Sequence, residues 1–105
     1  MSEALDEEFF QLADAHIKLS NTQLEEPFDR GKVSASMMFS TARFNAWVSA
    51  CGYVDPELMR QAKGDTIDYF VTQYRKMLEQ NFDDYVDNFE KYMKPAPTQE
   101  SKSEE

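Results

Sequence analysis

The sequence predicts an all-α protein, a compact bundle of three or four helices with the second helix at its centre. Three observations lead to this prediction. Apolar residues recur at helical spacing along most of the chain, and no segment shows the alternation of a β-strand. Only 3 Gly and 4 Pro occur in 105 residues, too few for the many tight turns of a sandwich or barrel. A long segment between Gly31 and Val54 contains no acid and few charges, which favours burial.

Length and composition indicate one folded domain over residues 1–94. A chain of 105 residues fits a single domain, and its 41% hydrophobic and 13% aromatic residues are enough to form a core. The last eleven residues, PAPTQESKSEE, contain no large apolar side chain. Residues 95–105 are therefore expected to form a disordered acidic tail.

The first helix is expected to begin at Leu5 or Asp6 and to end around Leu24. Acidic residues directly after Asp6 suit the positive end of a helix dipole. Helical spacing then places these residues along one stripe: Phe9, Leu12, Ala13, His16 and Ile17. Pro27 and Gly31 predict a loop over residues 25–32.

The second helix is expected over residues 33–51 and is the most informative segment. Its only nearby charges are Lys32 and Arg43, and apolar residues lie on more than one of its faces. A helix that is apolar nearly all round is normally buried on several sides, so this segment is predicted to be the central helix. Gly52 is the candidate for a left-handed residue that ends it.

The third helical segment starts at Asp55, a favourable N-cap residue that is followed by Pro56 at the first helical position. Apolar residues keep helical register from there to Met93. The dipeptide at 64–65, a Gly and an Asp, can interrupt the helix. Two interpretations follow, one helix over 56–93 or a short helix to residue 63 with a long one from 65, and the second is preferred.

The charge of the chain excludes some functions. With 20 acids and 11 Lys or Arg, the formal net charge is −9, which repels phosphate backbones and anionic lipid. We therefore expect neither nucleic acid nor membrane as a partner. The first residues lack the basic start of a signal peptide, and no segment has the ~18 apolar residues of a membrane span. The single cysteine, Cys51, fits a reducing compartment, so a cytoplasmic location is predicted.

Reactive side chains are few and isolated. Asp83, Asp87 and Glu90 share one helix face, which is interpreted as a solvated surface because the patterns of di-iron, EF-hand and zinc sites are absent. His16 and Cys51 are interpreted as residues at or in the core. No catalytic residue, cofactor or metal ligand is therefore predicted, and the protein is not expected to be an enzyme.

Four residues are candidates for contacts with a partner: Arg43, Trp47, Tyr69 and Tyr92. Arg43 is the lone charge along the second helix, and its alternative role is pairing with a carboxylate of a neighbouring helix. Trp47 has an alternative role as a core anchor. The two tyrosines drift away from the apolar stripe of the third segment, and tyrosines favour half-exposed interfaces.

Several short strings of residues together resemble a known family. They are Phe9-Phe10-Gln11-Leu12-Ala13, Ala42-Arg43-Phe44-Asn45-Ala46, Gln73-Tyr74-Arg75-Lys76-Met77-Leu78 and Asn81-Phe82-Asp83-Asp84-Tyr85. In these strings the chain resembles a family of uncharacterised proteobacterial proteins, domain of unknown function 3144, over about residues 6–94. The resemblance implies a helical fold and a bacterial, cytoplasmic origin. It implies no activity, cofactor or catalytic residue.

Two functions of different classes remain open. The first is a non-enzymatic protein-interaction module that associates with itself or binds another protein through helix faces. It is motivated by the second helix, which has more apolar circumference than two or three neighbours in so small a domain cover. The second is a small-ligand or metal-binding protein that uses the bundle interior or the acidic face over residues 83–90.

Overall fold

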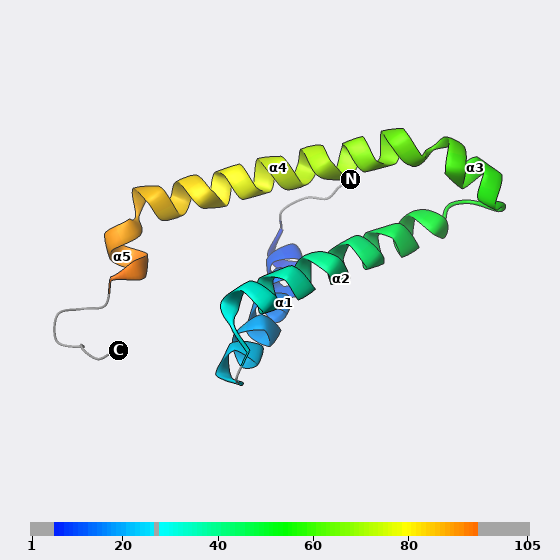
Figure 1. Ribbon diagram of the computed structural model, residues 1–105. Helices are drawn as coiled ribbons and strands as arrows, with labels where there is room; N and C mark the ends of the chain where they lie inside the picture. Colours follow the sequence, from blue (N-terminus) through cyan, green and yellow to red (C-terminus); the bar gives the residue numbers. More distant parts are fainter. Residues whose placement is uncertain (1–5, 27, 95–105) are drawn as a thin grey trace. The chain divides into compact units, whose positions relative to one another are not determined.

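The computed structural model describes residues 6–26 and 28–94, and within these ranges the chain forms five helices and no strand (Figure 1). The all-α prediction is confirmed. The predicted tail over 95–105 lies outside the described residues. The chain divides into two structural units, one up to Val54 and one from Asp55 onward, which are taken in turn.

The first unit contains helices α1 (Glu7–Glu25) and α2 (Arg30–Ala50). Each helix begins at an aspartate whose side chain accepts a hydrogen bond from the backbone. Asp6 Oδ1 lies 2.8 Å from the Phe9 amide nitrogen, and Asp29 Oδ1 lies 2.7 Å from that of Lys32. Because Asp29 supplies this cap, α2 begins three residues before the predicted start at residue 33.

The end of α2 differs from the prediction at Gly52. The C-cap residue is Cys51 in a right-handed conformation, and Gly52 does not adopt a positive φ angle. The Gly52 amide instead donates to the carbonyl oxygen of Ser49 at 3.0 Å, which closes the last turn tightly. The expectation of a left-handed glycine was therefore wrong, since this helix end needs none.

Helices α1 and α2 pack on each other through small and flexible side chains. Val33 is 6% exposed, and Ala13, Ser20 and Met37 are partly buried. The Ser20 hydroxyl lies 3.8 Å from the Met37 sulfur, which joins the two helices at this point. Small residues on α1 allow a close approach, but they cover little of the apolar surface of α2.

Within the first unit, the second helix is not buried on several sides as predicted. Val33 is the only buried residue of α2, whereas Phe39 is 70% exposed and Trp47 is 61% exposed. The physical reason lies within the first unit, where α2 has one neighbouring helix and a single neighbour covers one side of a helix. The apolar circumference that predicted a central position is present, but within the first unit α1 covers only one side of it.

The second unit contains α3 (Pro56–Gln61), α4 (Lys63–Asp87) and α5 (Phe89–Met93). As predicted, Asp55 caps α3: its Oδ1 accepts a hydrogen bond from the Leu58 amide at 3.0 Å, and Pro56 follows it. The preferred interpretation of a short and a long helix is confirmed. The break lies at Ala62, however, and Gly64 falls inside the first turn of α4.

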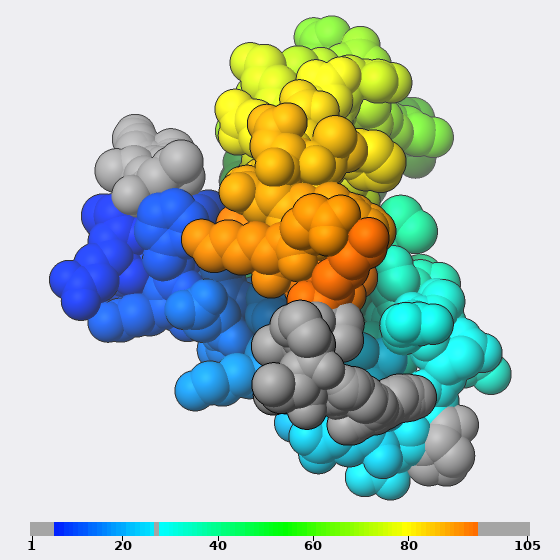
Figure 2. Space-filling view, turned by 90° about the vertical axis from the view of Figure 1, so that its left-hand side faces the viewer, coloured from blue at the N-terminus to red at the C-terminus, as the bar shows by residue number. Residues whose placement is uncertain are grey.

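A second break, which the sequence did not predict, separates α4 from α5 at Asn88. Its backbone leaves the helical region (φ −118°, ψ 28°), and its side-chain amide donates to the carbonyl oxygen of Asp84 at 3.0 Å. An asparagine that bonds to the preceding turn in this way competes with the helix. The chain changes direction here, within the orange part of the ribbon before α5 in Figure 1, and the space-filling view shows the orange side chains of this region on the face turned to the viewer (Figure 2).

Candidate association surfaces

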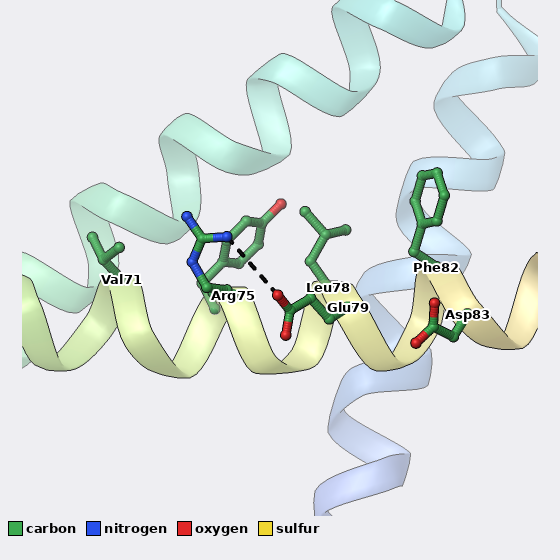
Figure 3. A pocket seen from close by; sticks show the side chains of 7 residues that line it. Val71, Arg75, Leu78, Glu79, Phe82 and Asp83 are labelled. Atoms are coloured by element: carbon green, nitrogen blue, oxygen red, sulfur yellow. Dashed lines mark ion pairs between the residues drawn. The ribbon is translucent and has the colours of Figure 1, made fainter.

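A shallow groove runs along one flank of α4. Its floor is apolar and consists of Val71, Tyr74, Leu78 and Phe82. Its edge is charged and consists of Arg75, Glu79 and Asp83 (Figure 3). We call these seven residues the α4 groove. The helical repeat explains the arrangement, since residues three or four apart lie on the same face.

The floor of the α4 groove is largely exposed to water. Leu78 is 48% exposed and Phe82 is 65% exposed, and no residue of α3, α4 or α5 is buried. At the edge, Arg75 Nη1 lies 3.9 Å from Glu79 Oε2. Both side chains are exposed, so this ion pair stabilises the helix by only a few tenths of a kcal/mol. The carboxylates of the edge are therefore available to another cation.

A second surface lies on α2. Phe44, Trp47 and Val48 are exposed and sit within one turn and a half of the helix, beside Arg43. We call these four residues the α2 patch. The rings of Phe44 and Trp47 are tilted, with their centroids 5.6 Å apart. The aromatic pair thus forms a single apolar projection with a cation at its margin.

Arg43 makes no ion pair with a carboxylate in the part of the chain that the structure describes. The alternative role considered for this residue, pairing with a neighbouring helix, is therefore not found there. Trp47 is likewise exposed and does not anchor a core. These two candidate residues lie one turn apart on α2, as their spacing requires.

The two candidate tyrosines are exposed, as expected from their positions. Tyr69 packs its ring edgewise on Phe70 at 5.3 Å. Tyr92 is held by its own unit: its hydroxyl donates to Asp84 Oδ2 at 3.1 Å, and its ring lies 5.0 Å from that of Tyr85. The hydrogen bond to the Asp84 carboxylate, and then its negative charge, raise the pKa of Tyr92.

The structure thus gathers only part of the candidate set. Arg43 and Trp47 share a surface, whereas Tyr69 lies in the second turn of α4 and Tyr92 in α5. Sequence reasoning missed the groove residues as a surface. The helical register of the apolar residues up to Met93 was recognised, but an apolar stripe in a sequence does not show what covers it.

The acidic face over residues 83–90 does not collect into a metal site. Among the described residues, no group of three or more His, Cys, Asp or Glu side chains is placed to hold a metal ion. Asp84 instead accepts hydrogen bonds from Asn88 and Tyr92. Its carboxylate is used to join α4 to α5.

The interpretation of Cys51 as a core residue was wrong, and His16, which was interpreted as lying at the edge of the core, is exposed as well. Both are exposed. His16 lies on α1, which has only α2 as a neighbour within its unit, and Cys51 follows the last turn of α2. Neither side chain reaches a position that other elements of the first unit enclose.

No helix in the described part of the chain combines the length and apolar character needed to cross a bilayer. In comparisons with known proteins, the family model described as "Protein of unknown function (DUF3144)" matches residues 9–86. This match confirms the resemblance predicted from the short helical strings. No curated protein and no solved structure matches the chain.

Proposed function

The chain belongs to the DUF3144 family, and we propose that it is a small, non-enzymatic protein-interaction module that works by associating with a second copy of itself. One observation carries the proposal. Among the described residues Val33 is the only buried apolar side chain, while large apolar residues on every helix are exposed. Such a distribution is typical of a chain whose core is completed by another molecule.

The energetic argument follows from the hydrophobic effect. Each Å² of apolar surface removed from water contributes about 25 cal/mol, and monomeric proteins rarely expose a continuous apolar patch above a few hundred Å². Here 41% of the residues are hydrophobic, and the α2 patch and the α4 groove are each exposed within their own unit. Association is the step that removes these surfaces from water.

The segments outside the described residues are poorly suited to cover these surfaces. Residues 95–105 contain Ala as their only hydrophobic side chain, and residues 1–5 contribute only Met1, Ala4 and Leu5. We propose that a separate molecule covers these surfaces. A second copy is the simplest choice. The same chain carries both exposed surfaces, so a single equilibrium between monomer and dimer removes both of them from water.

The alternative function, small-ligand or metal binding, has less support. In the acidic segment that motivated it, Asp84 accepts hydrogen bonds from Asn88 and Tyr92. The proposed location is the cytoplasm, where the exposed thiol of Cys51 stays reduced and does not cross-link copies at random.

Size-exclusion chromatography with light scattering tests the proposal. The full chain is measured from micromolar to millimolar concentration, at low and at high salt. We expect the mass to rise from that of one chain, 12.2 kDa, toward twice that value, and to do so at both salt concentrations because apolar burial is not screened. A mass of one chain at every concentration would remove the proposal.

A further inference from the structure

We infer that the joint between α4 and α5 is a hinge with two states. In the bent state the Asp84 carboxylate holds α5 at an angle to α4, and in the straight state α4 continues through Met93 as one helix. The hinge residue is Asn88, which is partly buried and caps both helices. All the contacts involved lie inside the second unit, and the inference does not rest on the proposed self-association.

Two side chains hold the bent state by donating to the same carboxylate. The Asn88 side-chain amide donates to Asp84 Oδ1 at 2.9 Å, and the Tyr92 hydroxyl donates to Asp84 Oδ2 at 3.1 Å. The rings of Tyr85 and Tyr92 also meet edgewise, with their centroids 5.0 Å apart. We call Asp84, Asn88 and Tyr92 the latch. Because Asp84 belongs to α4 and Tyr92 to α5, the latch fixes the angle between the two helices.

The contact between Asp84 and Tyr92 depends on the bend. In a continuous helix, two residues eight positions apart are separated by about 12 Å along the axis, and only residues three or four apart are neighbours on the surface. Straightening therefore separates the carboxylate of Asp84 from the hydroxyl of Tyr92. The hydrogen bond between them favours the bent state alone.

The backbone on both sides of the joint is already helical. The Asn88 amide donates to the Asp84 carbonyl oxygen at 3.0 Å, and the Tyr92 amide donates to that of Asn88 at 2.9 Å, both with the spacing of an α-helix. A rotation at Asn88 of about 55° in φ and about 70° in ψ brings its backbone to helical values. The amides of Phe89 and Lys91, which make no backbone hydrogen bond to α4 in the described structure, then reach carbonyl oxygens of α4. These bonds favour the straight state.

The hinge sets the length of the apolar face of α4. Beyond Phe82 of the α4 groove, apolar residues continue at spacings of three and four, namely Tyr85, Phe89 and Met93. In the straight state these residues continue the groove floor along one helix face, whereas in the bent state α5 turns away from the axis of α4 (Figure 1). A molecule that binds the longer face more tightly shifts the hinge toward the straight state.

Nuclear magnetic resonance of the full chain tests the hinge at the level of single residues. The coupling between the amide and α protons is large at the φ of −118° that Asn88 has in the bent state, and it is small at helical φ. We expect the wild type to show the large coupling, together with nuclear Overhauser effects between the rings of Tyr85 and Tyr92. Asp84→Ala removes the acceptor of both latch bonds. It should lower the coupling to the helical value, abolish the ring contacts, and slow hydrogen exchange at the Phe89 and Lys91 amides by at least about tenfold.

Matched variants separate the latch from general effects on the helix. Asp87→Ala makes the same change within one turn of Asp84, at a carboxylate that makes no hydrogen bond to the latch among the described residues, and should leave the coupling unchanged. Tyr92→Phe removes only the latch hydroxyl and should lower the coupling part of the way. Tyr85→Phe removes a hydroxyl that makes no hydrogen bond to the latch among the residues described, and should leave it unchanged.

Three results would overturn the inference. A small coupling at Asn88 in the wild type would show that the chain is straight without any change to the latch. Equal couplings in the wild type and Asp84→Ala would show that the carboxylate does not hold the bend. Faster exchange at the Phe89 and Lys91 amides in Asp84→Ala would show that α5 unfolds instead of joining α4. If Asp84→Ala loses helicity in circular dichroism, Tyr92→Phe decides in its place: a coupling equal to that of Tyr85→Phe would refute the latch.

Discussion

Replacing Leu78 by alanine gives the most quantitative prediction, because its contribution can be worked out from its exposure. Leu78 lies on the floor of the α4 groove and is 48% exposed in the single chain. Burying a leucine side chain completely stabilises a protein by about 1.5–3 kcal/mol, so the half that remains exposed contributes about 1 kcal/mol when a partner covers it. Two copies contribute about 2 kcal/mol, which is about 30-fold in the dissociation constant of the dimer.

Sedimentation equilibrium of the full chain measures this effect directly. The matched control is Leu19→Ala, which removes the same atoms from a 59% exposed position on α1, outside both proposed surfaces. We expect a roughly 30-fold weaker dimer for Leu78→Ala and an unchanged dimer for the control. Identical dissociation constants for wild type and Leu78→Ala would refute the reasoning.

Three further predictions concern single interactions. Asp84 raises the pKa of Tyr92, so the folded chain favours the protonated hydroxyl. The resulting contribution to folding stability is present below the ordinary tyrosine pKa of about 10, and it is lost as the pH rises through the raised pKa. Asp84→Asn should lower the Tyr92 midpoint, measured as the 295 nm absorbance difference between each protein and its Tyr92→Phe derivative. Asp29→Ala removes the N-cap of α2 and should lower the free energy of unfolding by about 1 kcal/mol in urea. Asp29→Asn should retain most of the stabilisation that the cap provides. Gly64→Ala should raise the free energy of unfolding by about 0.5–1 kcal/mol, measured by thermal unfolding. Gly64 lies inside α4, where alanine is favoured over glycine, and an added Cβ has no other atom within 4 Å.

Features that depend on neighbours in the sequence were predictable. The cap at Asp55, the following Pro56 and the division into a short and a long helix follow from hydrogen bonds within one turn of the chain. The start of α2 was placed too late for a related reason. Asp29 carries the same capping signal, but Pro27 and Gly31 on either side of it indicated a loop.

Features that depend on distant contacts were not predictable. The apolar circumference of α2 shows that Phe39 and Trp47 gain from burial, but it does not show what buries them. A neighbouring helix of the same chain and a helix of a second copy leave the same pattern in the sequence. The groove at Leu78 was missed for this reason, although its spacing had been recognised.

The dependence of thermal unfolding on protein concentration tests the central claim, that a second copy completes the core of this chain. If folding and association are coupled, mass action stabilises the folded state as concentration rises. We predict that the midpoint of the helix transition in circular dichroism increases steadily from micromolar to millimolar protein. A sharp transition with the same midpoint across that range would show that the chain buries its apolar surface alone, and would contradict the account.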